Sequence, residues 1–249
     1  MSNEDLKSIK NNILKDKDIE LINKIDYDIE VDYKLNLFIA KKDRVDYVYN
    51  TAALEGNPFT LPEVQTLLEG VTVGGHKLSD EQMILNQNKS VNLLFDLINS
   101  NEFGLNKETL LKLHTEVSYE EALEWGKFRS GNVRITGTSY LAPKSQYLDE
   151  IFSKNMEKLQ EIKHPINRAI IYFLLGARNQ YFYDGNKRTS RLMMNGELLS
   201  NGYPLLNIKV KDQLEFNKTM IEYYDTNNIL RALEYLSKYY LKQSKELND

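Results

Sequence analysis

The chain has 249 residues, with 32 basic and 36 acidic side chains and a formal net charge of −4. This balance excludes the strongly basic surface typical of nucleic-acid-binding proteins, and the absence of cysteine excludes disulfides and thiolate metal sites. The longest apolar run, near residues 169–177, is shorter than the roughly 18 residues that a membrane span needs. Because the N-terminus is charged and unlike a secretory signal, we expect a soluble, cytoplasmic protein with neither nucleic acid nor membrane as a partner.

Apolar positions at helical spacing predict helices through the N-terminal part of the chain. Residues 1–30 carry a few such positions, and residues 31–50 carry a stripe that is typical of core. Thr60 is followed by Pro62 and Glu63, and a threonine cap with proline and an acid in the first turn favours the start of a helix. We therefore expect a short helix from this point to about residue 70.

Two further helices are expected before the middle of the chain. Ser79 with Gln82 fits a capping box, which predicts the start of a long helix through residues 84–97. Residues 107–120 form another amphipathic pattern, with His114 on or near its apolar side. A lone histidine in such a place is more often a hydrogen-bonded core residue than a ligand, so we expect His114 to be structural.

Residues 124–146 differ in character from the rest of the chain. They combine β-branched and aromatic side chains with glycines, and Pro143 closes the segment. This is the best signal for a strand or hairpin in the chain. On its own it predicts a surface hairpin of unassigned purpose.

The stretch around residues 180–191 joins two predicted helices. Apolar residues 166–178 predict a buried helix, Asp184-Gly185-Asn186 predicts a tight turn, and a second helix should follow to residue 200. A Gly/Asn turn at a helix start leaves backbone N–H groups free for an anion such as phosphate. Arg188 and Arg191, one turn apart, can bind the same anion, and Asp184 can hold a divalent cation. The alternative is a helix–turn–helix with solvated arginines.

Beyond this stretch, residues 209–224 and 227–246 are predicted to form two more amphipathic helices. The chain shows no internal repeat and no low-complexity linker. We interpret the two C-terminal helices as packing extensions, with a dimer or partner surface as the alternative. The whole chain is therefore predicted to be mainly α-helical with one small β-hairpin.

Residues 180–191 resemble the signature of the Fic family (the Fic/Doc, or Fido, fold), which reads H-x-F-x-(D/E)-G-N-(G/K)-R-x-x-R. The matching positions are Phe182, Asp184, Gly185, Asn186, Lys187, Arg188 and Arg191. The family's histidine falls on Gln180. The resemblance implies a Fic-type helical bundle with a small β-hairpin flap and appended N- and C-terminal helices.

Two other stretches are similar to the same family. Residues 126–143 resemble its flap, which registers a target protein by strand addition. Residues 51–56 match the inhibitory motif (S/T)-x-x-x-E-(G/N) of the class that carries its inhibitory helix in the same chain. The motif residues are Thr51, Glu55 and Gly56. The resemblance thus implies an N-terminal helical extension over residues 1–45, a Fic core over 46–205 and a C-terminal helical extension over 206–249.

The chemistry that the resemblance implies is transfer of AMP from ATP to a Ser, Thr or Tyr hydroxyl of a target protein. Asp184 would hold Mg²⁺, as a carboxylate beside phosphates can. The implied ATP-binding residues are Gly185, Asn186, Lys187, Arg188 and Arg191, with an additional donor from the Asn186 side chain. The implied catalytic positions are Gln180, Asn186 and Arg188. Self-modification and homo-oligomerisation stay open.

The same resemblance assigns regulatory and docking roles. Glu55 would pair with Arg191 and so keep the γ-phosphate from its productive place, since a carboxylate competes with phosphate for an arginine fork. The flap residues that would dock the target are Val133, Arg134, Ile135, Thr136 and Gly137.

Gln180 sets the limit on the implied activity. Histidine suits a general base because its pKa is about 6.5, whereas an amide cannot carry a proton away. Loss of a general base typically lowers the rate by about 10²–10⁴-fold. The sequence therefore leaves open an inactive module that binds ATP and docks a protein. Lys187, which also occurs in the Doc-like branch, leaves phosphate transfer as a minor alternative.

Overall fold

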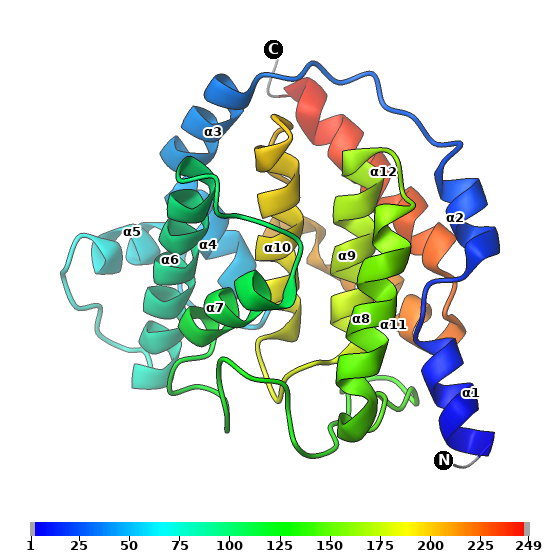
Figure 1. Ribbon diagram of the computed structural model, residues 1–249. Helices are drawn as coiled ribbons and strands as arrows, with labels where there is room; N and C mark the ends of the chain where they lie inside the picture. The colour runs from blue at the N-terminus through cyan, green and yellow to red at the C-terminus, as the bar shows by residue number, and fades with distance from the viewer. Residues whose placement is uncertain (1–2, 247–249) are drawn as a thin grey trace.

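The computed structural model describes residues 3–246, where helices make up all the regular structure apart from one isolated antiparallel bridge between Arg134 and Leu141 (Figure 1). The α-helices in chain order are α1 (Asn3–Asn11), α2 (Asp16–Ile22), α3 (Tyr33–Lys42), α4 (Arg44–Ala53), α5 (Leu61–Leu68), α6 (Leu78–Asn99), α7 (Lys107–Val117), α8 (Leu148–Gln160), α9 (Pro165–Asn179), α10 (Asn186–Ser200), α11 (Gln213–Thr226) and α12 (Ile229–Glu246). Two short 3₁₀ helices, η1 (Ser145–Tyr147) and η2 (Val210–Asp212), precede α8 and α11. The mainly helical class predicted from the sequence is confirmed.

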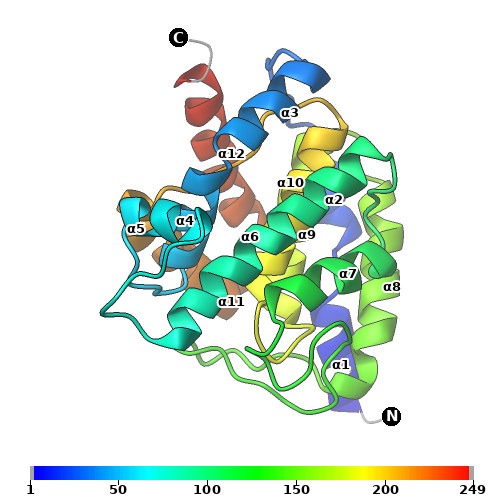
Figure 2. The ribbon, with the colours of Figure 1, turned by 90° about the vertical axis from the view of Figure 1, so that its left-hand side faces the viewer.

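Helices α9 and α10 form the centre of the bundle (Figure 1). Nearly every residue of both helices is buried, and a helix that is buried all round needs neighbours on every side. Those neighbours are α8 and α12 against α9, and α6 and α7 against α10. Figure 2 shows α6 running across the molecule on the side where α4 and α5 lie.

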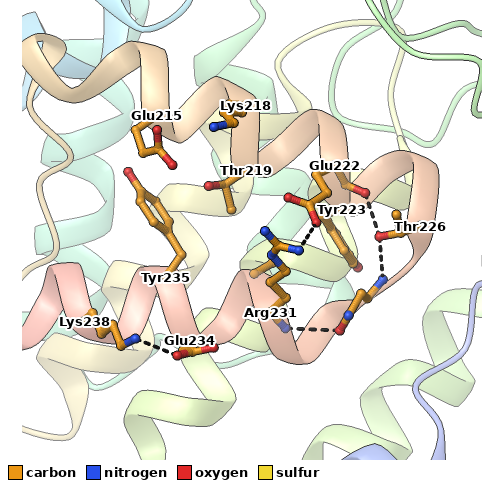
Figure 3. Close-up of a pocket in the computed structure, with 12 residues that line it drawn as sticks. Glu215, Lys218, Thr219, Glu222, Tyr223, Thr226, Arg231, Glu234, Tyr235 and Lys238 are labelled. Carbon is orange, nitrogen blue, oxygen red and sulfur yellow. Dashed lines mark hydrogen bonds and ion pairs between the residues drawn. The ribbon is translucent and has the colours of Figure 1, made fainter.

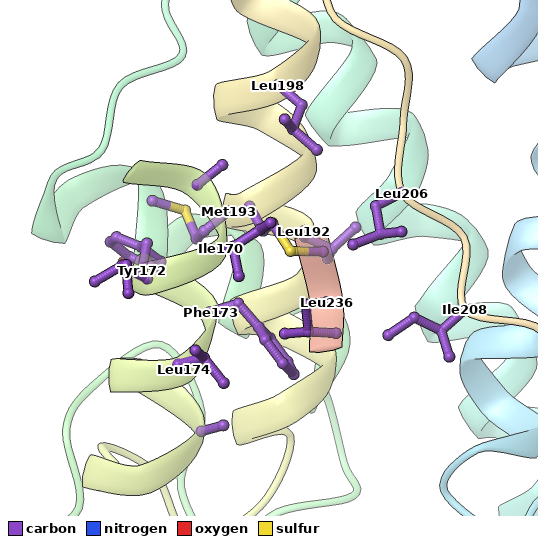
Figure 4. Close-up of a cluster of buried hydrophobic side chains, with 14 of the residues drawn as sticks. Ile170, Tyr172, Phe173, Leu174, Leu192, Met193, Leu198, Leu206, Ile208 and Leu236 are labelled. Atoms are coloured by element: carbon purple, nitrogen blue, oxygen red, sulfur yellow. The ribbon is translucent and has the colours of Figure 1, made fainter. Parts of the chain in front are cut away.

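The apolar core extends between these helices. In Figure 4, Phe173 of α9, Leu192 of α10 and Leu236 of α12 come together. At the edge of the core, Gly196 of α10 allows a close contact with Phe103, because a Cβ at Gly196 would lie 2.1 Å from the Phe103 ring. Packing of this kind fixes α9 and α10 against their neighbours.

The terminal helices pack on the same core. The Tyr27 hydroxyl, just after α2, donates to Asn167 Oδ1 of α9 at 2.6 Å and bonds Ser237 Oγ of α12 at 2.7 Å. Residues 1–2 and 247–249 of the predicted terminal extensions lie outside the described residues. The three-part division of the chain stays a prediction.

Helix boundaries confirm some local predictions and correct others. Glu63 Oε2 accepts a hydrogen bond from Thr60 N at 2.7 Å at the start of α5, as predicted. The predicted cap at Ser79 is wrong, because α6 already begins at Leu78. Leu78 is 82% exposed, so water can satisfy the first amides of α6 without a side-chain cap. The single helical stripe over residues 31–50 is two helices, which are separated at Asp43.

The predicted hairpin over residues 126–143 is not confirmed, because the described segment contains no regular strand and only the isolated antiparallel bridge between Arg134 and Leu141. Apart from this bridge the segment is an extended loop, and two of its carbonyl groups accept hydrogen bonds from a side chain. Arg129 donates to the carbonyl oxygens of Gln180 at 2.6 Å, Gly131 at 2.5 Å and Pro143 at 2.5 Å. Arg129 therefore ties the two ends of the segment to the last residue before the α9–α10 turn.

Candidate functional site

A cavity of about 500 Å³ lies where the α9–α10 turn, the loop over residues 126–143, the end of α4 and helix α11 meet. The residues that line it are Leu54, Glu55, Gly56, Met83, Arg134, Ile135, Thr136, Gln180, Tyr183, Asp184, Gly185, Asn186, Lys187, Arg188, Asn217, Met220, Ile221 and Tyr224. Most of the predicted site residues therefore lie around one space. The exceptions are Thr51, Val133, Gly137 and Arg191, which do not line it.

The turn between α9 and α10 is closed by the Asn186 side chain. Its Oδ1 accepts from Phe182 N at 2.9 Å, while its Nδ2 donates to Phe182 O at 2.8 Å and to Gln180 Oε1 at 3.1 Å. Gly185 adopts φ +73°, and a Cβ there would lie 2.2 Å from Ser118 Oγ, so glycine is required. Because its amide is bonded within the turn, Asn186 does not fit the expected role of an additional phosphate donor.

Gln180 ends α9 in the left-handed conformation, with φ +49°. Its side-chain Nε2 donates to Ala177 O at 2.6 Å, and its Oε1 accepts from Asn186. Both ends of the amide are thus bonded to the protein itself. An amide so placed has no capacity to accept a proton from a substrate.

His114 is buried on α7 and stacks on Phe182, with ring centroids 3.5 Å apart. Its Nδ1 accepts from Gly126 N at 3.1 Å, which leaves Nε2 protonated to donate to Asp184 O at 3.0 Å. Burial lowers the pKa of His114 to about 4. His114 is therefore a fully bonded structural residue, as predicted. None of the chain's 3 histidines lines the cavity.

Arg188 is buried beneath the turn, with its Nη1 3.0 Å from Glu121 Oε2 and 3.2 Å from Val117 O. Burial raises the pKa of Glu121, and the charge of Arg188 opposes that effect. The pairing fixes the guanidinium of Arg188 at the wall of the cavity. Glu121 could not be predicted from the sequence, because the residues that follow α7 show no pattern that points toward the α9–α10 turn.

Glu55 binds two basic side chains of α10. Its Oε1 lies 2.5 Å from Arg191 Nη2, and its Oε2 lies 2.8 Å from Lys187 Nζ. Burial opposes ionisation of Glu55, but Arg191 and Lys187 outweigh it and lower the pKa of Glu55 to about 2. Glu55 is thus a carboxylate at neutral pH, held beside the N-terminus of α10.

Arg191 is 2% exposed and also donates to Thr51 O at 3.4 Å. Its Nε and Nη1 atoms are buried and have no hydrogen-bond partner among the described residues. The expected pairing of Arg191 with Glu55 is present, and Lys187 joins the same carboxylate in place of pointing at an anion.

Asp184 stands at the rim of the cavity with 63% of its side chain exposed. Its Oδ1 accepts from Gly185 N at 2.6 Å, and its Oδ2 lies 3.8 Å from Arg188 Nη2. Across residues 3–246, no group of three or more His, Cys, Asp or Glu side chains is arranged to hold a metal ion. A single carboxylate suits Mg²⁺ only when phosphates and water supply the remaining ligands.

Helix α11 forms one wall of the cavity. From the sequence alone, this helix was predicted to be a packing extension. Its cavity-lining residues, here called the α11 wall, are Asn217, Met220, Ile221 and Tyr224. They fall at i, i+3, i+4 and i+7, the spacing of one helix face. The spacing is visible in the sequence, but it does not distinguish a cavity wall from core.

A second hollow, of about 250 Å³, lies between α11 and α12 (Figure 3). Four of its charged side chains form two pairs: Arg231 Nη1 lies 2.7 Å from Glu222 Oε1, and Lys238 Nζ lies 2.6 Å from Glu234 Oε1. None of the predicted site residues lines this hollow. The candidate site is therefore the cavity at the α9–α10 turn. None of the described helices is long and apolar enough to cross a membrane.

Comparison with known proteins identifies similar chains. The model of the Fic/DOC family matches residues 104–198. The protein adenylyltransferase Fic of Drosophila erecta is 30% identical over 174 residues, covering 66% of this chain and 34% of that protein. The protein adenylyltransferase fic-1 of Caenorhabditis briggsae is 27% identical over 176 residues, covering 68% of this chain and 34% of that protein. The chain spans about a third of the length of these curated relatives.

A solved structure shares the fold. Fic-1 from Caenorhabditis elegans superposes with a TM-score of 0.73 at 20% identity, covering 97% of this chain and 71% of that chain. The likeness therefore includes the terminal helices as well as the centre of the bundle.

Proposed function

Because the model of the Fic/DOC family matches residues 104–198, we propose that the cavity binds ATP and that the chain transfers AMP to a hydroxyl of a target protein. The observation that carries the proposal is the placement of Glu55. This carboxylate occupies the basic side chains of α10 where a phosphate would otherwise bind. A buried carboxylate on an arginine and a lysine is what an inhibited phosphate site would contain.

The charges of the cavity suit a nucleoside triphosphate. The N-terminal amides of α10 and the Arg188 and Lys187 side chains face the cavity from one side. Asp184 at the rim would hold Mg²⁺ together with the phosphates, and the ion would offset phosphate charge there. Arg191, once released by Glu55, would add its unpaired N–H groups to the same end.

The proposed reaction is a displacement at the α-phosphorus. The oxygen of a Ser, Thr or Tyr hydroxyl forms the new bond, the bond to pyrophosphate breaks, and the hydroxyl proton must leave. Gln180 cannot take this proton, because its amide does not titrate and is bonded at both ends. We therefore expect strong activity to be absent with Gln180 in place.

Glu55 supplies the proposed inhibition. As long as it holds Arg191, the γ-phosphate cannot occupy the same guanidinium. The loop residues Arg134, Ile135 and Thr136 also line the cavity, and a target segment docked on that rim of the cavity would meet the α-phosphate. Docking of a target at that rim belongs to the proposal.

A second candidate function is an inactive module that binds ATP and docks a protein. The lack of any histidine in the cavity favours it, since no imidazole replaces the missing base. Phosphate transfer of the Doc type is a minor third candidate. Lys187, the residue that suggests it, is bound to Glu55.

Incubation with Mg²⁺ and ATP labelled at the α-phosphate separates these candidates. The proteins to compare are the unchanged chain, Gln180→His, Glu55→Gly and the double variant, with label on the chain itself and bound ATP as readouts. We expect label only when histidine is present, and more label when Glu55 is also removed. Label on the unchanged chain would overturn the role given to Gln180. ATP binding without label in all four proteins would favour the inactive module.

A further inference from the structure

The hydroxyl of Tyr224 is an unpaired polar group in the wall of the cavity. Tyr224 is 4% exposed, and its hydroxyl oxygen is buried without a hydrogen-bond partner among the described residues. Buried polar groups are nearly always hydrogen-bonded, because an unpaired one has lost its water without compensation. The Tyr224 hydroxyl is therefore expected to find a partner when the cavity is filled.

The cavity has two chemically different sides. Asp184, Lys187 and Arg188 make the side at the turn charged. The α11 wall offers one amide, two apolar side chains and one phenol, and no charge. A ligand with an anionic end and a neutral, partly apolar end would fit both sides at once, with its neutral end against α11.

We propose that the Tyr224 hydroxyl hydrogen-bonds the nucleoside of the nucleotide bound in this cavity, which makes Tyr224 a residue that positions and selects the ligand. The inference rests on the proposed ATP site and assigns α11, which lies outside the matched residues 104–198, a direct part in it. Burial and the nearby Glu55 carboxylate raise the pKa of Tyr224, so the phenol stays protonated and can donate.

Tyr172 provides a matched control. It is also buried, and its hydroxyl likewise lacks a hydrogen-bond partner among the described residues. Tyr172 belongs to α9 and does not line the cavity. Tyr→Phe at either position removes only a hydroxyl, so effects on folding should be alike and effects on the ligand should not.

The test compares Tyr224→Phe and Tyr172→Phe, each combined with Glu55→Gly so that the carboxylate does not compete with the ligand. Calorimetry with Mg²⁺ and either ATP or inorganic triphosphate measures affinity. We expect Tyr224→Phe to weaken ATP binding about five- to tenfold, the effect of one lost hydrogen bond. Triphosphate binding should not change, and Tyr172→Phe should leave both affinities unchanged.

Unchanged ATP affinity in Tyr224→Phe would overturn this inference and leave the proposed ATP site intact. Equal losses for ATP and triphosphate would overturn it as well, because the hydroxyl would then face the phosphates. Equal losses in the Tyr172 control would show a general effect on the fold, again against the inference. Failure of the folded Glu55→Gly parent to bind ATP would overturn the proposed function and the inference together.

Discussion

At the scale of single residues, the site is defined by which partner each charged side chain has. Glu55 has two cationic partners, Arg191 and Lys187, and the sequence motif predicts only the first. Two cations on one carboxylate hold it more firmly than one, since each favours the ionised form. The second partner therefore strengthens the contact that we propose as inhibitory.

Lys187→Gln should raise the pKa of Glu55 from its present value of about 2. Loss of one neighbouring positive charge shifts a carboxyl by about one pH unit or more, while Arg191 remains in place. NMR titration of isotopically labelled glutamate carboxyl groups measures the pKa of Glu55 in both proteins. Lys112→Gln is the control, because the Lys112–Glu108 pair is exposed and distant in sequence. An unchanged Glu55 titration would show that Arg191 alone determines its ionisation.

At the scale of elements, the site depends on how closely α10 is surrounded. Its first turn carries Lys187 and Arg188, its middle meets α6 and α7, and Gly196 near its end contacts the Phe103 ring. Residues 126–143 lie in a loop with one antiparallel bridge, and the Arg129 side chain bonds the carbonyl groups of Gly131 and Pro143 near its ends. Helices thus position Lys187 and Arg188, while a loop supplies the lining residues Arg134, Ile135 and Thr136.

Gly196→Ala should destabilise the protein although alanine is the better helix former by about 1 kcal/mol. The added Cβ would lie 2.1 Å from the Phe103 ring, and such overpacking costs about 1–3 kcal/mol. Denaturant unfolding measures the difference. Gly74→Ala, at a position with open space, should be neutral or slightly stabilising. If Gly196→Ala were as stable as the unchanged protein, the close contact between Gly196 and Phe103 would be contradicted.

At the scale of the whole molecule, helices from both ends of the chain pack on one core. Tyr27 joins the region after α2 to α9 and α12 through two hydrogen bonds. His114 joins α7 to the α9–α10 turn from the other side. The stability of the entire fold should therefore respond to the protonation of a residue in contact with the site.

The free energy of unfolding should fall as the pH is lowered from about 6.5 toward 4. Burial lowers the pKa of His114 to about 4, so in this range the unfolded chain binds a proton that the folded chain refuses. Neutral His114 makes its full contribution to the free energy of unfolding above the pKa of the unfolded chain. About 3 kcal/mol of that free energy is lost by pH 4. Denaturant unfolding across this range should show a smaller pH dependence for His114→Gln.

His76→Gln serves as the comparison, since its ring stacks on Phe59 away from the cavity. This variant should keep the pH dependence that His114 causes. A pH dependence unchanged by His114→Gln would mean that other groups govern stability in acid.

The sequence by itself determined the helical class, the positions of α9 and α10, and the residues of the turn, because these depend on local spacing and local motifs. It also predicted the Glu55–Arg191 pairing through motif resemblance. At residues 126–143, glycines and β-branched residues predicted a hairpin, and the structure has only one antiparallel bridge there, between Arg134 and Leu141.

Only the tertiary structure decided which distant groups share the site. The face of α11 that lines the cavity has the same periodicity as a core face, so no local signal separates the two. Glu121 meets Arg188, and Lys187 joins Glu55, through packing between segments far apart in the chain. Whether a charged or polar group is paired depends on such long-range contacts, and those depend on how the helices pack together.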